Sequence, residues 1–249
     1  MVSLRVGMLS GTLLLSLGLS AVAAKDRPPV ATAEYEILLD GTRIGNEKVE
    51  VIKSKKYEVR SEATRFWPEP NRFELRYELG PSFVPKKLEV SASRDGQVLE
   101  MELKGRKKDW RSEVKGKNLK KRRQDLGPRE GAEIDFDSPL FKGLIVRRLN
   151  LRPGEERVVE AIQFDLPELT GTRKRQAYRR IDDGEVETRA TGPVVAAAYE
   201  LASGDTTYQI WTNESGVVLI MRTELPAGVL EYELVRLESK PGAWTPPVK

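Results

Sequence analysis

The sequence predicts a mainly β protein: a curved antiparallel sheet forming a half-open barrel or clam of about ten to twelve strands, with one short helix near residues 139–149. Three observations predict it. Apolar and charged residues alternate over many short segments, turn-forming Gly pairs lie between these segments, and residues 139–149 alone have helical spacing. Alternation with period two gives a strand one dry face and one wet face, which is typical of antiparallel sheets.

Residues 1–24 have the layout of a secretory signal peptide. Arg5 supplies a positive start, Leu13–Leu19 a short apolar region, and Ala21–Ala24 the small residues before a cleavage site. The apolar region is shorter than the roughly 20 residues of a membrane-spanning helix. We therefore expect cleavage, a soluble protein with no transmembrane segment, and a periplasmic or secreted location. The chain has no cysteine, so we do not expect a lipoprotein.

The remaining chain predicts one β domain over residues 34–240. Residues 25–33 form an entry linker, and residues 127–131 divide the domain into two possible halves. Residues 241–249 contain three prolines and predict a disordered tail.

The strands of the domain are predicted from alternation and from their turns. The segment Arg72–Leu79 places every apolar residue on one face and every charged residue on the other. The predicted turns are Asp40-Gly41, Asp95-Gly96, Asp183-Gly184, Gly204-Asp205 and Asn213–Gly216. Asp-Gly pairs tolerate the positive φ angles of tight hairpins. We expect a meander of hairpins with no βαβ unit.

The helix at residues 139–149 is predicted by its cap and by its apolar stripe. Ser138 or Asp137 caps it, and Pro139 suits the first helical position. The stripe consists of Leu140, Phe141, Leu144, Ile145 and Leu149. Gly143 weakens the helix by about 1 kcal/mol relative to Ala. The stripe fits a connector packed in the core, and it equally fits a lid over a ligand cavity.

A basic stretch runs from Lys104 to Arg123. It has eleven basic and two acidic residues, a charge of +9, whereas the rest of the chain after residue 24 has 30 basic and 36 acidic residues. The candidate patch for an anionic partner is Lys107, Lys108, Arg111, Lys120, Lys121, Arg122 and Arg123. Such residues attract anionic lipid headgroups, although charge runs often only face water. Export argues against nucleic acid as the partner.

Composition excludes several kinds of active site. The chain has no histidine and no cysteine, so it has no Ser-His-Asp triad, no thiolate nucleophile and no zinc site built on these residues. Asp135, Asp137, Asp182 and Asp183 do not form a calcium-loop motif. No nucleotide-binding glycine motif occurs. We expect no enzyme, no catalytic residues, no metal and no cofactor.

Four residues are candidates for contact with a ligand. Trp67 lies in a loop beside two prolines, where an aromatic ring can line the mouth of a cavity. Phe141, Leu144 and Ile145 are the centre of the helical stripe.

Motifs along residues 33–238 resemble a family of exported bacterial domains of unknown function. The opening segment is Tyr35–Gly45, followed by Ser138-Pro139-Leu140, then Arg152–Glu155, and finally a tryptophan strand that returns over Gly216–Arg222. The resemblance implies a curved antiparallel sheet similar to the half-open barrels of periplasmic lipoprotein carriers and glycolipid-binding proteins. It implies no catalytic residues, and the basic stretch is not part of its pattern.

These observations favour an exported, non-catalytic carrier or binding protein for an amphiphilic or anionic envelope component, such as a lipid, a glycolipid or a lipoprotein. One alternative is an interaction or structural module of the envelope that binds no small ligand. Another is a glycan hydrolase that uses two carboxylates.

Overall fold

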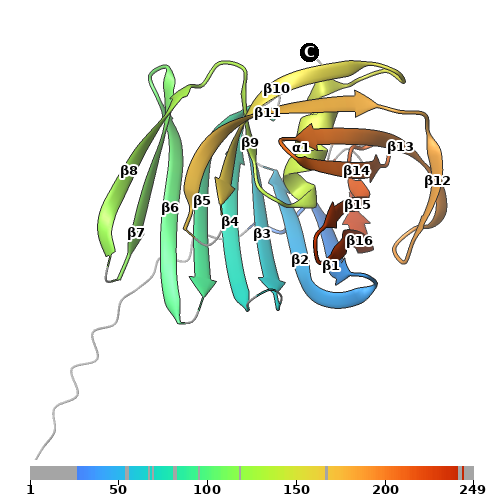
Figure 1. Ribbon diagram of the computed structural model, residues 1–249, viewed down its shortest axis with the longest axis horizontal. Coiled ribbons are helices and arrows are strands. Elements are labelled where there is room, and N and C mark those ends of the chain that lie inside the picture. The colour runs from blue at the N-terminus through green and yellow to red at the C-terminus, as the bar shows by residue number, and fades with distance from the viewer. Residues whose placement is uncertain are drawn as a thin grey trace, which may run out of the picture.

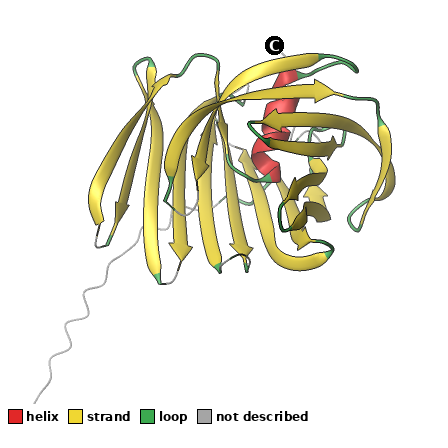
Figure 2. Ribbon diagram, viewed as in Figure 1, coloured by secondary structure: helices red, strands yellow, loops and turns green. Residues whose placement is uncertain are grey.

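The structure, a computed structural model, describes residues 27–53, 56–66, 68, 70–80, 83–94, 96–117, 119–165, 168–240 and 243. These residues form sixteen strands and one helix (Figures 1 and 2). The strands are β1 (Ala31–Leu39), β2 (Thr42–Lys53), β3 (Tyr57–Arg65), β4 (Asn71–Leu79), β5 (Pro85–Arg94), β6 (Gln97–Arg106), β7 (Asp109–Gly116), β8 (Leu119–Pro128), β9 (Ala132–Asp135), β10 (Glu156–Asp165), β11 (Thr170–Arg180), β12 (Gly184–Thr188), β13 (Gly192–Ser203), β14 (Thr206–Thr212), β15 (Val218–Leu225) and β16 (Gly228–Ser239). The helix is α1 (Pro139–Leu149). The expected signal peptide and all of the tail except Ala243 lie outside the described residues.

The strands form one continuous sheet. Fifteen of them follow the order β8-β7-β6-β5-β4-β3-β2-β1-β16-β15-β14-β13-β11-β10-β9, and β12 pairs with β13 beside this path. The sheet curls on itself, so that β9, β10 and β11 cross in front of the wall formed by β3–β5 (Figure 1). The expected curved β architecture is therefore confirmed, and the curl continues to a nearly closed barrel.

Two details of the predicted sheet were wrong. The described residues form more strands than expected, because β8 and much of β11 have few buried residues and lack the apolar alternation that marks a strand. The sheet also contains a parallel pair, β9 with β10, joined through α1. A parallel pair needs a crossover connection, so β9, α1 and β10 form the βαβ unit that alternation did not reveal.

Most predicted turns are hairpins of the fold. Asp40 and Gly41 both have positive φ, 46° and 77°, as the turn between β1 and β2 requires. Gly204-Asp205 joins β13 to β14, and Asn213–Gly216 joins β14 to β15. Asp183-Gly184 is different, since β11 and β12 both pair with β13 and not with each other. Asp183 ends the connection between them and Gly184 begins β12, so this pair forms no tight hairpin. Asp95 lies outside the described residues.

The apolar face of the sheet lines the interior, and α1 lies inside it. Alternate residues such as Val49 and Val51 of β2 or Tyr77 and Leu79 of β4 are buried. The helix contacts β15 and β9, and its Phe141 ring packs on Tyr77 of the opposite wall. Burial of these apolar surfaces holds the two walls of the barrel to the helix.

The helix has the predicted bounds and the predicted cap. Ser138 is the N-cap, its hydroxyl accepts a hydrogen bond from the Leu140 amide, and Pro139 opens the helix. Asn150 ends it in the left-handed conformation. Residues Pro139–Val146 are all buried, so α1 packs inside the barrel as a core element and does not lie over a mouth as a lid. Among the described residues, no helix is long and apolar enough to span a membrane.

Candidate functional site

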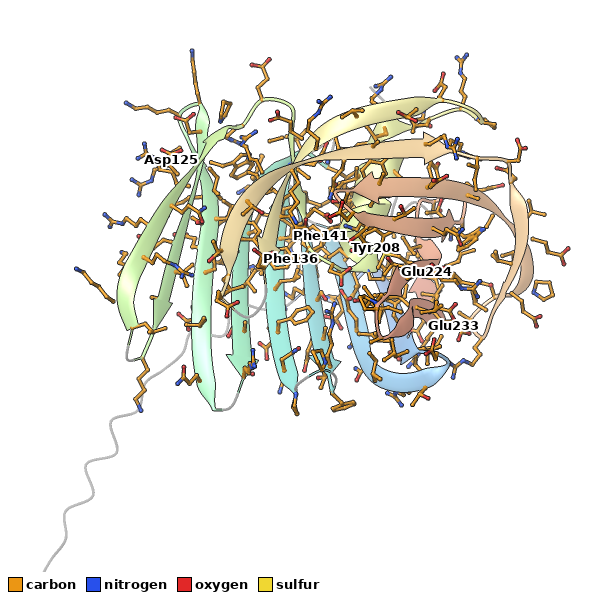
Figure 3. The ribbon with its side chains drawn as sticks, in the orientation of Figure 1. Asp125, Phe136, Phe141, Tyr208, Glu224 and Glu233 are labelled. Atoms are coloured by element: carbon orange, nitrogen blue, oxygen red, sulfur yellow. The ribbon has the colours of Figure 1, made fainter. Side chains whose placement is uncertain are left out.

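An aromatic column crosses the barrel interior. The ring centroids of Phe164 and Phe136 lie 5.2 Å apart, those of Phe136 and Phe141 5.3 Å, and those of Phe141 and Tyr77 5.2 Å. Figure 3 places Phe136 and Phe141 at the centre of the molecule. Edge and offset contacts at this separation stabilise ring pairs beyond the area they bury. The column joins α1 to β10 and to β4.

Three of the predicted ligand residues lie in this interior. Phe141 and Leu144 belong to the core that includes the column, and Ile145 packs with residues of β13–β16 on the other side of α1. Trp67 lies outside the described residues. Beside α1, Leu140, Leu144 and Val218 help to line a cavity of about 10 Å³. That volume is close to the room needed by one water molecule, so the interior next to the helix is filled by side chains.

A buried acid lies under the start of α1. Glu47 of β2 is 1% exposed, and its Oε1 accepts hydrogen bonds from the hydroxyls of Ser61 (2.7 Å) and Ser138 (2.6 Å). Its Oε2 has no hydrogen-bond partner among the described residues. Burial raises the pKa of Glu47, the negative charge of Asp137 raises it further, and the two serine hydroxyls and Arg65 oppose the shift. Glu47 is thus held as a neutral acid more readily than an exposed glutamate.

Arg65, at the end of β3, is close to Glu47 and also to the more exposed Asp137. Its guanidinium donates to the Asp137 carbonyl (2.6 Å) and to the Tyr232 hydroxyl, and that hydroxyl donates to the same carbonyl (3.1 Å). The Asp137 side chain is 30% exposed, whereas that of Arg65 is 16% exposed. Burial and the nearby Asp137 carboxylate raise the pKa of Tyr208. These groups fix the chain that leads from β9 into α1.

A second polar cluster lies deeper in the barrel. Lys142 of α1 donates to Asp135 Oδ2 (2.5 Å), and Gln176 Nε2 donates to the same oxygen (2.6 Å). Both charged side chains are fully buried, with exposures of 1% and 0%. The Lys142 ammonium also lies 5.0 Å from the ring centroid of Tyr208. Buried charges are tolerated when each is paired with an opposite charge and hydrogen-bonded, as Lys142 and Asp135 are here. Through these contacts the cluster joins α1, β9 and β11.

Sequence reasoning missed these buried charges. Alternation placed the charged residues of segments such as Arg72–Leu79 on the face opposite the apolar one, and Ser138 was expected only as a cap. One signal was present: Glu47 has the same parity as Val49 and Val51 in β2, which marks it as an inward residue. Lys142 gave no such signal, because a helix buried on all sides has no polar face.

The barrel has one place where backbone pairing stops. β11 pairs with β13 only from Gln176 to Arg180, so residues 170–175 have no strand partner on that edge and face β8. We name this place the seam. It consists of Arg122–Pro128 of β8 and of Glu168–Arg173, which cover the turn before β11 and the first residues of β11. Along the strand order from β8 to β9, each strand is joined to the next by a backbone ladder.

Side chains bridge the seam in place of a ladder. The Gln124 amide donates to the Gly171 carbonyl (2.5 Å) and accepts from the Gly171 amide (3.1 Å). Arg173 donates to the carbonyls of Leu126 (2.5 Å) and Pro128, and Arg122 donates to that of Glu168. These bonds break by rotation of side chains, without separation of a backbone ladder.

The aromatic column begins directly behind the seam. A Cβ atom placed on Gly171 would lie 2.9 Å from a ring carbon of Phe164 and 3.0 Å from a methyl carbon of Leu126. Glycine at this position therefore lets β11 approach the apolar side chains closely. The seam thus separates solvent from Leu126, Phe164 and the rings behind them by a single layer of backbone.

The predicted basic patch is divided among three places. Lys107 and Lys108 form the turn between β6 and β7. Arg111, Lys121 and Arg123 lie on the outer face, where Asp125 pairs with the first and Glu113 with the other two. Arg122 bonds across the seam, and Lys120 is exposed near the start of β8. The structure therefore does not bring the seven residues together as one surface.

The outer face of β2–β8 carries an open groove of about 860 Å³. Its charged lining residues are Lys48, Glu50, Arg60, Glu62, Glu74, Arg76, Glu89, Glu100, Glu102, Glu113, Lys115 and Lys121. Each of them has an oppositely charged partner, either within this set, as Lys115 has in Glu100 (2.7 Å), or beside it, as Arg76 has in Glu58 (2.7 Å). Leu75, Val90 and Met101 also contribute to the lining of the groove. Its charged side chains are satisfied by their partners and by water. Among the described residues, no group of three or more acids could hold a metal ion.

Comparisons with known proteins agree with the barrel. The chain is similar to the solved β-barrel-like protein of the domain of unknown function DUF1849 from Brucella abortus, with a TM-score of 0.57, 12% identity, and coverage of 86% of this chain and 99% of that one. It is also similar to a DUF1089 family protein from Pseudomonas aeruginosa, with a TM-score of 0.49, 17% identity, and coverage of 86% and 95%. No curated protein matches.

A family model described as putative glycolipid-binding matches residues 39–201, which is more than half of the chain. The match spans β2–β12 and most of β13, and it includes α1, Glu47, the aromatic column and both sides of the seam. It confirms the expected resemblance to glycolipid-binding proteins and to domains of unknown function. The chain belongs to the putative glycolipid-binding family.

Proposed function

We propose that the protein is an exported, non-catalytic carrier for an amphiphilic envelope component of the glycolipid class, and that the acyl chain of this ligand enters the barrel through the seam. One observation carries the proposal: β8 and the first half of β11 lie side by side over the apolar interior, and side-chain hydrogen bonds join them where no backbone ladder does. The family description and the barrel fold support a binding protein over an enzyme.

The energies involved make opening of the seam feasible. Five hydrogen bonds bridge it. The two bonds of the neutral Gln124 amide contribute about 0.5–1.5 kcal/mol each and the three bonds from charged arginines about 1.5–3 kcal/mol each, so their loss costs roughly 6–12 kcal/mol. An acyl chain gains about 0.8 kcal/mol for each methylene that it buries, so about 7–15 methylenes offset that cost. A ligand with a long apolar chain is therefore able to open the seam, whereas a free sugar is not.

The polar groups of the seam suit the headgroup. When the seam opens, Gln124 and the Gly171 peptide lose their partners and become available to sugar hydroxyls. Arg122 and Arg173 stand on opposite sides and would pair with an anionic substituent such as a phosphate.

The filled interior favours a second candidate. Because the space beside α1 is only about 10 Å³, an envelope interaction module that binds no small ligand would need no rearrangement. The carrier and the interaction module differ in whether the barrel takes up an acyl chain. Export itself rests on residues 1–24, and cell fractionation with and without those residues tests it.

Calorimetry with three probes tests the carrier proposal. Dodecyl maltoside, below its micelle concentration, supplies both a sugar and a chain, maltose supplies the sugar alone, and dodecylphosphocholine supplies a chain with another headgroup. The proposal expects binding of both chain-bearing probes with a negative heat-capacity change, and no binding of maltose. Absence of binding by both chain-bearing probes would favour the interaction module.

A further inference from the structure

The end of the sheet where β7 turns into β8 carries exposed apolar side chains. Leu119 is 56% exposed and Val98, at the start of β6, is 47% exposed. The β5–β6 and β7–β8 turns lie at the same end of the wall (Figure 1). A Cβ atom on Gly116 would lie 2.9 Å from a methyl carbon of Leu99 and 3.3 Å from one of Leu119, so these two leucines flank Gly116. Apolar side chains thus gather at this end.

Unpaired lysines surround these side chains. Lys115 and Lys121 pair with Glu100 and Glu113. Lys117 and Lys120 are exposed and have no acidic partner among the described residues. We name Val98, Lys117, Leu119 and Lys120 together the hairpin tip.

The opposite end of the same strands has the charge without the apolar residues. Lys107 and Lys108 form the β6–β7 turn and are exposed, and none of the exposed large apolar side chains among the described residues belongs to that turn. β7 has eight residues, so the two ends are about 25 Å apart. The chain therefore provides its own control for an effect of charge alone.

We propose that the hairpin tip docks on an anionic lipid bilayer. Lysines without acidic partners are attracted to an anionic surface, and they keep their long side chains free to reach it. An exposed leucine or valine between them enters the boundary between headgroups and acyl chains, where its burial from water is favourable. Neither feature alone would suffice, because single exposed apolar residues and charge runs are common on protein surfaces.

This docking is independent of the carrier function. An interaction module would dock in the same way, since the tip lies outside the barrel interior. If the carrier proposal also holds, docking brings the start of β8, and with it the seam residues Arg122 and Gln124, to the bilayer.

Cosedimentation with lipid vesicles tests the proposal on the full chain. The protein is mixed with vesicles of phosphatidylcholine alone or of phosphatidylcholine with phosphatidylglycerol. We expect binding only to the second kind, and weaker binding as the salt concentration rises. Equal binding to both kinds would overturn the proposal.

Three surface variants complete the test. K117Q/K120Q should weaken binding by about 30-fold, because each basic residue near an anionic surface contributes about a factor of five. L119S should weaken it by about tenfold through lost burial. K107Q/K108Q removes the same charge from the distant turn and should change it by less than about threefold, since that turn is more than a Debye length away. Equal losses in the two lysine pairs, or no loss in L119S, would overturn the proposal.

Discussion

Ser138 donates its hydroxyl to Glu47 Oε1 across 2.6 Å, although the two residues are 91 positions apart. The same hydroxyl oxygen accepts from the Leu140 amide (3.2 Å), so one side chain caps α1 and holds a buried acid of β2. Ser61 of β3 donates to the same carboxyl oxygen. The start of the helix is thereby fixed against the wall of the barrel.

The first prediction concerns the pH dependence of stability. Because burial raises the pKa of Glu47, the folded protein binds this proton more tightly than the unfolded chain does. Stability from this group is full at low pH and falls as the pH rises from about 4.5 through the folded pKa. E47Q keeps an acceptor for both serines but cannot ionise. Urea unfolding at several pH values should show that the free energy of unfolding of E47Q rises relative to that of the wild type as the pH rises.

The matched control is E50Q, which changes an outward residue of the same strand paired with Lys48. The free energy of unfolding of E50Q should change with pH in the same way as that of the wild type. A difference between E47Q and the wild type that does not change with pH would show that Glu47 has an ordinary pKa.

The second prediction concerns the buried pair of Lys142 and Asp135. K142M leaves the Asp135 carboxylate buried with only Gln176 as a donor. Loss of one partner of a buried pair typically costs about 3–5 kcal/mol. The double variant K142M/D135N removes both charges and should be clearly more stable than K142M. Unfolding free energies of the four proteins measure the coupling, and additive effects would mean that the pair is not coupled.

The third prediction reverses what helix propensity suggests. G143A should favour α1 by about 1 kcal/mol from propensity alone. In the barrel, however, an added Cβ would lie 2.7 Å from the Gly216 carbonyl oxygen, which belongs to the backbone. Overpacking of this kind typically costs about 1–3 kcal/mol. We expect a lower midpoint of thermal unfolding, and a higher midpoint would refute the close approach of α1 to this turn.

The fourth prediction concerns the rate of ligand uptake. Q124A removes two of the bonds that bridge the seam, and R173A removes two more. Both should speed binding of dodecyl maltoside in stopped-flow measurements, by about fivefold or more if each lost bond contributes at least about 0.5 kcal/mol to closure. S93A removes a side-chain bond to Arg72 where the ladder between β4 and β5 is intact, and it should leave the rate unchanged. Unchanged rates in Q124A and R173A would place the entrance elsewhere.

The sequence contained enough information for the hairpins and for the helix. Alternation in segments such as Arg72–Leu79 depends only on which residues avoid water, and this is a local property. The Ser138 cap and Pro139 likewise act within one turn of the helix. These elements were predicted because their causes are close in the chain.

Elements whose causes are distant were missed. β8 and the first half of β11 meet across the seam through Gln124 and Gly171, and nothing near either residue indicates that contact. The parallel pairing of β9 with β10 depends on where α1 packs. The basic stretch is divided among two faces and a turn because successive side chains of β8 point to opposite faces and Lys107-Lys108 form the turn before β7, and a count of charges along the chain does not reveal this.

A photoreactive dodecyl maltoside, with the reactive group at the end of its dodecyl chain, shows whether that chain enters the barrel through the seam. After irradiation and digestion, mass spectrometry identifies the labelled residues. Entry through the seam predicts labelling of Leu126, Phe164 and Phe136, the side chains behind the seam. It also predicts that an excess of unlabelled dodecyl maltoside strongly reduces this labelling. Labelling confined to exposed side chains such as Phe66 and Val195 would contradict entry of the chain into the barrel.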